Sequence, residues 1–319
     1  MIYGSVIDVI GETPLVALDR ITADLGLDGR LLAKPDNLLP GYSKKDRAAR
    51  AIIEAARASG DLKKGQTVVE LTSGNMGTGL AIVCAVLGHP FVAVMSAGNS
   101  TERARQMRAL GAEVVIVPQE AGSKTGEVSG ADLALVDAAA KAITEERHAF
   151  RADQFGHAGN PAAHEAGTGP ELWRQSGGAI TAFCDFAGSG GTLAGVTTAL
   201  SPHGVRCYAV EPEGAAAIAG GPITNPSHPI QGGGYAMSDL DHLRGVCLSG
   251  HLTVTGTEAR EAARMLSRRE GVFGGYSAGA NLAAAIQLLR GPEAGGTVAF
   301  IVCDSGLKYL STDLWDDET

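Results

Sequence analysis

The chain has 319 residues, of which 45% are hydrophobic, and its formal net charge is −9 at pH 7. This length and composition predict a globular protein with a large core in two domains, and the acidic balance without a Lys/Arg-rich block argues against nucleic acid or an anionic membrane as a partner. The N-terminus lacks the basic region and cleavage site of a secretory signal, no apolar run reaches membrane-spanning length, and the five scattered cysteines have no zinc or CxxC spacing. We therefore expect a cytoplasmic protein with buried free thiols and no metal.

Short β-branched apolar runs alternate with alanine-rich amphipathic segments along the chain. In the first half, strands are predicted at residues 67–71, 91–95 and 113–117, and helices at residues 77–87, 101–110 and 131–146. In the second half, strands are predicted at residues 180–187, 205–212 and 296–304, and a helix at residues 190–200. This β-α-β rhythm predicts parallel sheets covered by helices on both faces.

The rhythm occurs once before about residue 150 and once after it, and a polar stretch rich in Gly, Pro and His separates the two blocks. We predict two α/β domains, each an open, mostly parallel sheet flanked by helices. The smaller comprises residues 40–150, and the larger comprises residues 1–39 plus 151–319. The active site is expected in the cleft between them, at the carboxyl ends of strands. The polar insertion at residues 122–132 is predicted to be a mobile surface loop.

Three junctions between an apolar run and a helix carry glycine and hydroxyl residues, and the first two suit anion binding. These two are Thr72–Gly77 and Gly188–Thr192, and the third leads into Ser277. Helix N-termini attract anions because free N–H groups and the helix dipole point at the ligand, although the same residue types also serve as plain helix caps. The second junction lacks a Walker lysine and the GxGxxG spacing, so it favours a single phosphate monoester over a nucleotide.

Two further features bear on catalysis. Ser277 matches the GxSxG pattern of esterases, but only a very short apolar run precedes it and no histidine follows it, so the sequence argues against a hydrolase. Lys44 and Lys45 stand at a predicted helix start, where a buried lysine would have a lowered pKa and become nucleophilic because its charge opposes the helix dipole. The residues alone do not single out Lys45, and for Lys44 a solvated charged face is expected.

Together these segments resemble the cysteine synthase and cystathionine β-synthase family of fold-type II pyridoxal-phosphate enzymes. The resemblance covers nearly the whole chain and rests on an ordered series: IGETPLVAL, GYSKKDRAA, TSGNMGTGLA, QFGHAGNPAAHEAGTGPELW, GSGGTLAG, VEPEGA, IQGGG, GGYSAGA and DSGLKYLST. It implies the tryptophan synthase β-like fold and pyridoxal 5'-phosphate as cofactor. It also implies an amino-acid substrate, a small nucleophile and a homodimer, with no regulatory domain after the last strand.

The resemblance also implies a role for each residue. Lys45 is the catalytic residue and holds the cofactor aldehyde, Asn75 hydrogen-bonds the ring hydroxyl, and Ser277 faces the ring nitrogen. The phosphate is cradled by Gly188, Ser189, Gly190, Gly191 and Thr192. The substrate carboxylate is bound by Thr72, Ser73, Gly74 and Gln154, and the substrate end of the site is shaped by Met76, Gly232 and Tyr235.

The reaction implied by the resemblance is β-replacement on an O-activated L-serine through an α-aminoacrylate, with sulfide as the default nucleophile. Met76 stands where the family usually has threonine, and Tyr235 stands where small residues are usual. These departures keep two alternatives open: a synthase of a non-protein β-substituted alanine, and a serine/threonine dehydratase-type lyase. A non-catalytic regulatory binder fits less well, because Lys45, Asn75, Ser277 and the glycine loop are all present.

Overall fold

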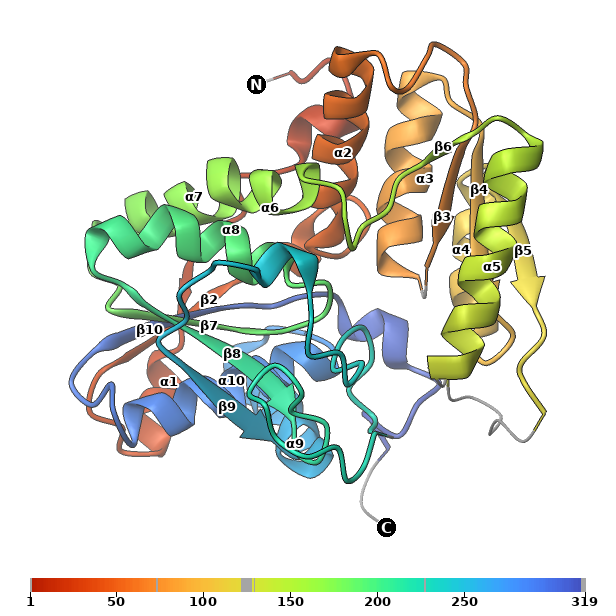
Figure 1. The fold of residues 1–319 in the computed structure, drawn as a ribbon. Helices are drawn as coiled ribbons and strands as arrows, with labels where there is room; N and C mark the ends of the chain where they lie inside the picture. Colours follow the sequence, from red (N-terminus) through yellow and green to blue (C-terminus); the bar gives the residue numbers. More distant parts are fainter. Residues whose placement is uncertain (1, 73, 122–127, 129, 227, 317–319) are drawn as a thin grey trace. The chain divides into compact units, whose positions relative to one another are not determined.

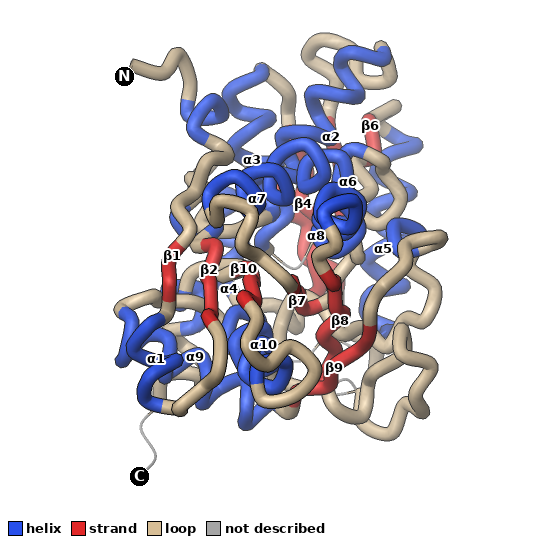
Figure 2. The backbone as a smooth tube through the Cα atoms, turned by 90° about the vertical axis from the view of Figure 1, so that its left-hand side faces the viewer, coloured by secondary structure: helices blue, strands red, loops and turns tan. Residues whose placement is uncertain are grey.

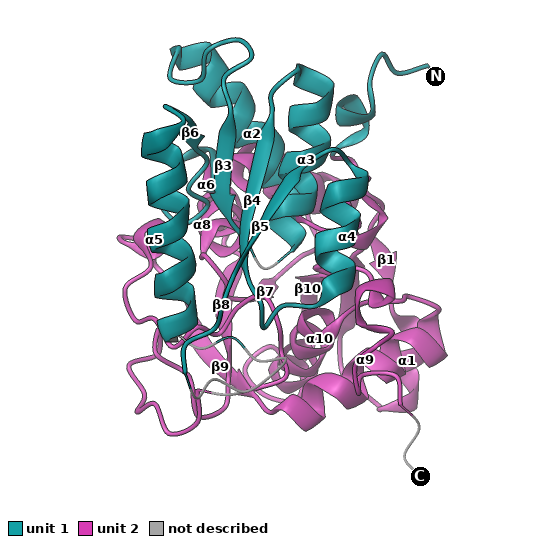
Figure 3. Cartoon of the chain, turned by 90° about the vertical axis from the view of Figure 1, so that its right-hand side faces the viewer, with its two compact units in different colours: residues 1–10, 45–160 teal, residues 11–44, 161–319 magenta. Residues whose placement is uncertain are grey.

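The computed structural model describes the chain except residues 1, 73, 122–127, 129, 227 and 317–319. The chain forms two compact units, each with its own sheet (Figures 1 and 3). Unit 1 comprises residues 1–10 and 45–160, and unit 2 comprises residues 11–44 and 161–319. The domain limits predicted from the sequence, near residues 40 and 150, stay a prediction. In the described part of the chain, no helix is both long and apolar enough to cross a bilayer.

Unit 1 contains a parallel sheet flanked by helices. Its main elements are α2 (Lys45–Ser59), β3 (Val68–Leu71), α3 (Asn75–Leu87), β4 (Phe91–Ser96), α4 (Thr101–Ala109), β5 (Glu113–Val117), α5 (Gly130–Glu146) and β6 (Phe150–Arg151). The strand order is β5-β4-β3-β6, and every neighbouring pair is parallel. Every residue of β4 is buried, as expected for a strand whose sheet is covered on both faces. The strands predicted at residues 67–71, 91–95 and 113–117 are thereby confirmed.

Unit 2 contains a larger, mostly parallel sheet in the order β1-β2-β10-β7-β8-β9, whose strands Figure 2 shows in red. Only the edge pair β1–β2 is antiparallel among the described strands. A short helix, α6 (Gly159–Ala163), spans the boundary of the units in the sequence. The other elements of unit 2 are β1 (Val16–Ala17), α1 (Asp19–Asp24), β2 (Arg30–Lys34), α7 (Gly169–Gln175), β7 (Ala182–Phe186), α8 (Gly191–Leu200), β8 (Arg206–Pro212), β9 (Gly250–Val254), α9 (Gly256–Glu270), α10 (Tyr276–Leu289) and β10 (Thr297–Ile301).

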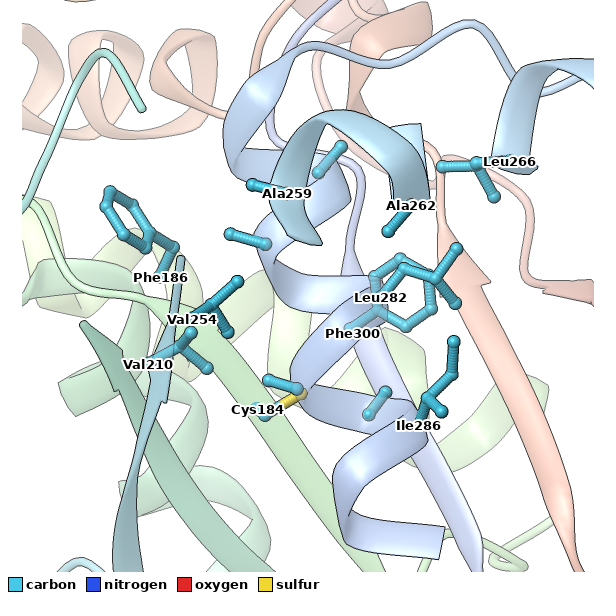
Figure 4. Packing of buried hydrophobic residues seen from close by; sticks show 14 of the residues in the cluster. Cys184, Phe186, Val210, Val254, Ala259, Ala262, Leu266, Leu282, Ile286 and Phe300 are labelled. Carbon is cyan, nitrogen blue, oxygen red and sulfur yellow. The ribbon is translucent and has the colours of Figure 1, made fainter. Parts of the chain in front are cut away.

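Two apolar clusters cover the faces of the larger sheet. One lies between the sheet and helices α9 and α10, and Figure 4 shows Phe186, Val210 and Phe300 of the strands with Leu282 and Ile286 of α10. The other lies between the sheet and α8, with Leu193, Val196 and Leu200 among its members. A Cβ on Gly279 would lie 1.9 Å from the carbonyl oxygen of Ala259, so α10 approaches α9 closely only because this residue is glycine.

The predicted loop at residues 122–132 falls largely outside the described residues. Its last residues, 130–132, belong to α5. Asp132 is buried there, and its side chain accepts a hydrogen bond from the backbone N–H of Glu120 at 2.8 Å. This carboxylate therefore ties the first turn of α5 to the segment that follows β5.

Candidate active site

The turn between β3 and α3 in unit 1 is built around the hydroxyl of Thr72. This oxygen accepts hydrogen bonds from the backbone N–H groups of Gly74 at 3.0 Å and Gly77 at 2.9 Å. Gly74 has φ +142°, a conformation that favours glycine, and no acidic residue occupies the first turn of α3. Thr72 therefore satisfies N–H groups of this turn, which is the capping role that the sequence analysis left open for residues of this type. Ser73 itself lies outside the described residues.

The structure brings other predicted cofactor and substrate residues to the same end of the unit 1 sheet. Asn75 and Met76 are the first two residues of α3, and Met76 is only 2% exposed. The side-chain amide of Gln154 donates to the carbonyl oxygen of Leu71 at 3.2 Å, which fixes it at the carboxyl end of β3. The hydroxyl, amide and N–H groups expected to bind a carboxylate thus gather within one unit.

Two charged residues near this turn were not anticipated. The buried side chain of Arg103 on α4 packs against Gly74, with its Cδ 2.6 Å from the place a Cβ would take. Glu70 on β3 is buried and accepts a hydrogen bond from the backbone N–H of Asp153 at 2.7 Å. Burial raises the pKa of Glu70 to about 7, against the opposing effect of Arg151. No local motif indicates either contact, because the partners are distant in sequence.

Lys45 is the first residue of α2, which agrees with its predicted position at a helix start. Its side chain is partly exposed. The expectation for its neighbour Lys44 is wrong. Lys44 is buried, and its ammonium forms hydrogen bonds with both carboxylate oxygens of Asp185, at 2.8 and 2.6 Å. Burial alone would lower the pKa of Lys44, but the Asp185 carboxylate outweighs it and holds the pKa above its usual value.

The predicted phosphate loop follows β7 in unit 2 and opens α8. Gly190 is the N-cap of α8, with φ +82°, and no side chain caps this helix. The first turn of α8 contains no acidic residue, and the hydroxyl-bearing residues Ser189 and Thr192 are buried beside it. N–H groups and hydroxyls without a carboxylate are the donor set that a phosphate monoester requires, so these residues fit the phosphate of the implied cofactor.

Three contacts complete this end of unit 2. The hydroxyl of Thr192 lies 3.2 Å from Nε2 of buried His164. His164 stands in one of the segments that carry the family resemblance, but the sequence analysis gave it no role. A Cβ on Gly188 would lie 2.7 Å from the carbonyl oxygen of Gly232, so the loop around Gly232 packs directly on the glycine loop. A small pocket is lined by Gly188, Tyr235 and Met237 among others. The structure thus brings Gly232 and Tyr235 to the predicted phosphate loop.

Ser277 occupies the second position of α10 rather than capping it. The N-cap is Gly275, which has no side chain with which to cap this helix. Ser277 is buried in the first turn of this helix. The segment before α10 forms only an isolated bridge between Gly274 and Ser305, which agrees with the sequence argument against an esterase elbow.

The described cysteines are all free thiols. Four of the five free cysteines are buried and Cys247 is exposed. Within the part of the chain that the structure describes, no group of three or more His, Cys, Asp or Glu side chains could hold a metal ion.

Fold and site together define an α/β protein with mostly parallel sheets. Helices α3 and α8 follow buried strands and have no acidic residue in their first turns, as in enzymes that bind phosphorylated cofactors. Comparison with known families makes this specific. Residues 6–304 match the model of the pyridoxal-phosphate dependent enzyme family, and the chain belongs to that family. Its cofactor is accordingly pyridoxal 5'-phosphate, and its fold is that of the fold-type II enzymes.

Individual relatives place the chain near the cysteine synthases. It is 37% identical over 315 residues to a cysteine synthase of Staphylococcus aureus (strain Mu50), covering 98% of this chain and 96% of that protein. A crystal structure of O-ureido-L-serine synthase superposes with a TM-score of 0.87 at 35% identity, covering 100% of this chain and 98% of the other. O-acetylserine sulfhydrylase isoform 3 from Entamoeba histolytica gives a TM-score of 0.90 at 31% identity, covering 100% and 93%.

Proposed function

We propose that the chain catalyses β-replacement on an O-activated L-serine such as O-acetylserine, with sulfide as the nucleophile. One observation carries the proposal: each unit opens a helix after a buried strand with no acidic residue in the first turn, α3 in unit 1 and α8 in unit 2. An amino-acid carboxylate and a cofactor phosphate are the two anions that such a reaction must hold. The likeness to cysteine synthases over nearly the whole chain supports the same reaction.

The roles of individual residues are part of the proposal. The hydroxyls and N–H groups of Gly188, Ser189, Gly190, Gly191 and Thr192 hold the phosphate, Asn75 binds the ring hydroxyl, and Ser277 is the neutral partner of the ring nitrogen. Thr72, Ser73, Gly74 and Gln154 hold the substrate carboxylate, and Met76, Gly232 and Tyr235 shape the substrate end. Arg103, which packs against Gly74, adds a positive charge near that turn.

Pyridoxal phosphate supplies an electron sink for negative charge at the substrate Cα. Lys45 would hold the cofactor aldehyde, and its amine would act as the general base that takes the substrate Cα proton and later returns it. A serine at the ring nitrogen withdraws less charge than an aspartic acid would, and this favours loss of the Cβ leaving group over transamination. The comparisons do not favour a dehydratase-type lyase or a non-catalytic binder.

The test uses the purified protein loaded with its cofactor. O-acetylserine alone should change the absorbance spectrum of the cofactor, and sulfide should restore it with release of cysteine and acetate. O-phosphoserine, L-serine and L-serine with homocysteine are the comparison substrates. Borohydride reduction followed by peptide mapping should place the cofactor on Lys45, and Lys45→Ala should abolish the label. The proposal fails if no O-activated serine changes the spectrum, or if the label maps to Lys44.

We further propose that the protein acts in the cytoplasm as a homodimer. Buried free thiols suit a reducing compartment. Four large apolar side chains of the N-terminal segment, Ile2, Tyr3, Val6 and Val9, are exposed to solvent in the single chain. A cluster of this kind supports a self-association surface, since monomers rarely leave such patches uncovered.

A further inference from the structure

The chain turns sharply just before Gln154, one of the residues proposed to bind the substrate carboxylate. Asp153 has φ +46°, a left-handed conformation that residues with a side chain rarely adopt. It lies shortly after the strand β6, which pairs with β3 in unit 1 (Figure 3). Such a conformation persists only where its surroundings hold it, and it is often found beside functional residues. The contacts that hold this turn therefore bear on how Gln154 is placed.

Glu70 holds the turn from β3. Its carboxyl group accepts hydrogen bonds from the backbone N–H groups of Asp153 at 2.7 Å and Gln154 at 3.4 Å, one on each oxygen. A carboxylate offers two acceptor oxygens and no hydrogen of its own, so it suits two adjacent N–H donors better than an amide does. Glu70 is only 1% exposed, and burial makes its charged form costly. The chain thus keeps a costly group at the point where the backbone of Gln154 is fixed.

Two further hydrogen bonds fix Gln154. The buried amide of Asn160 donates to its backbone carbonyl oxygen at 2.7 Å. Its own side-chain amide donates to the carbonyl oxygen of Leu71 at 3.2 Å, directly before Thr72 of the proposed carboxylate turn. The amide nitrogen is also the group by which a glutamine binds a carboxylate, because it is the only donor of the side chain. Backbone and side chain of Gln154 are thus both tied to the carboxyl end of β3.

The charged groups that bear most on Glu70 come from β6 and the turn after it. Nε of Arg151 lies 3.6 Å from Oε2 of Glu70, and Arg151 in turn donates to the carboxylate of Asp137 on α5 at 3.0 Å. Burial and the charge of Asp153 favour the neutral form of Glu70, and Arg151 and the two N–H groups favour the charged form. The balance raises the pKa of Glu70 to about 7. Both forms of this carboxyl are therefore accessible near neutral pH.

We propose that Glu70 is a positioning residue for Gln154: its carboxylate holds the N–H groups of Asp153 and Gln154, and so directs the Gln154 side chain to the substrate carboxylate. The inference rests on the proposed role of Gln154, and Glu70 itself is assigned no contact with substrate or cofactor. Protonation places a hydrogen on one carboxyl oxygen, where it competes with the N–H of Gln154, the longer of the two contacts. The neutral form of Glu70 therefore holds Gln154 less firmly than the charged form.

The experiment uses the protein loaded with its cofactor and the variant Glu70→Gln, which imitates the neutral form at every pH. The dissociation constant of L-serine is followed by the absorbance of the bound cofactor. It should match the wild-type value at pH 5 and exceed it about tenfold at pH 8, the effect of one lost hydrogen bond. Ionisation of the ligand affects both proteins alike, so the ratio reports Glu70. With O-acetylserine and sulfide at pH 8, KM for O-acetylserine should rise while kcat changes less than about twofold.

Stability supplies a readout of opposite sign. Because burial penalises the charged form of Glu70, Glu70→Gln should resist urea better than the wild type at pH 8. A merely structural contact would lose stability and substrate affinity together. Weaker binding of L-serine by a more stable variant therefore distinguishes a positioning residue from a packing residue.

Asp132 provides a matched control in unit 1. It is also a buried carboxylate that accepts a backbone N–H, that of Glu120 at 2.8 Å. Asp132→Asn should leave the dissociation constant of L-serine unchanged at both pH values. An effect as large as that of Glu70→Gln would overturn the inference.

Arg151 tests whether Glu70 is the group that titrates. Since the Arg151 guanidinium favours the charged form of Glu70, Arg151→Met should move the pH at which binding of L-serine strengthens to a higher value. A midpoint that stays in place would assign the pH dependence to another group and overturn the inference.

The double variant Glu70→Gln/Gln154→Ala tests whether Glu70 acts through Gln154. Once the Gln154 side chain is absent, Glu70→Gln should weaken L-serine binding no further, and an undiminished tenfold effect would overturn the inference. Tighter binding by Glu70→Gln at pH 8 would also overturn it, because the carboxylate would then repel the substrate. Wild-type affinity in Glu70→Gln at pH 8 refutes the inference alone and leaves the proposed function intact. If no O-activated serine changes the spectrum of the wild type, the proposed function fails and the inference falls with it.

Discussion

At the scale of single residues, Met76 is the position where substrate preference is expected to respond most. It is the second residue of α3, beside the proposed carboxylate turn. Met76→Thr would supply the hydroxyl that the family usually has there, so kcat/KM for O-acetylserine and sulfide should rise relative to the other substrates. Because the methionine side chain is buried, the loss of packing should also lower the free energy of unfolding by about 2 kcal/mol or more. Steady-state kinetics and urea unfolding measure the two effects separately.

Met107 on α4 is a suitable control for this substitution. It is fully buried in the same unit, and its sulfur packs against Gly77. Met107→Thr should destabilise unit 1 to a similar degree and leave the ranking of substrates unchanged. If Met76→Thr alters stability alone, as the control does, Met76 is a packing residue and its proposed role at the substrate end is wrong.

Glu70 makes the stability of unit 1 depend on pH. Its pKa in the folded chain is raised from an ordinary value of 4.5 to about 7, so the folded state holds this proton more tightly than the unfolded state. The resulting contribution is fully present below pH 4.5 and is lost as pH rises to 7, a change of roughly 3 kcal/mol at 1.36 kcal/mol per pKa unit. Glu70→Gln removes the titration, so the variant should gain stability relative to wild type between pH 5 and pH 8 in urea unfolding.

Glu113 on β5 provides a control of opposite sign. Its hydrogen bonds with Arg147 lower the pKa of this half-exposed carboxyl, so its contribution is present at neutral pH and is lost as pH falls. Glu113→Gln should therefore differ from wild type at pH 7 and converge with it in acid. A Glu70→Gln variant whose stability runs parallel to that of wild type across this range would show that the carboxyl titrates normally in the folded chain.

At the scale of elements, the sequence predicts those strands and helices that have a clear local pattern of apolar residues. Every residue of β4 and β7 is buried, so their apolar runs stand out, and the helices after them begin at glycine or hydroxyl residues. The sequence pattern does not predict β1, β2, β6 and β9, of which β2 and β9 are the longer two. β2 begins and ends with a cation, and β9 is an edge strand whose residues are mostly only half-buried or exposed. Both lack the continuous apolar run by which a parallel strand is recognised.

Contacts between distant elements explain the remaining errors. Lys44 and Asp185 are 141 residues apart, so nothing near Lys44 indicates that its charge is compensated. Arg103 reaches Gly74 from a different helix. A charged residue in a short polar segment is on average solvated, and the local sequence therefore favours exposure unless a partner is known.

At the scale of the whole molecule, the chain forms two units that each have a sheet and an apolar core of their own. Composition and length are sufficient to predict two domains, since a core of this size seldom remains single. The assignment of residues in both units to one cofactor follows instead from the ordered motifs. The turns alone are compatible with capping, and Thr72 does satisfy N–H groups of its own turn.

The proposed homodimer can be tested through the N-terminal segment of unit 1. Val6 and Val9 are the first and last residues of a 3-10 helix that Ser5 caps, and both are 45% exposed. If they pack against a second chain, Val6→Asp/Val9→Asp places two carboxylates in that contact, and the desolvation cost should dissociate the dimer. Light scattering after size exclusion should give twice the chain mass of 32.6 kDa for the wild type and the single mass for the variant.

Val86→Asp on α3, where the valine is 42% exposed in the same unit, is the matched control and should remain dimeric. A monomeric wild type, or equal dissociation by both variants, would contradict this assignment of the surface.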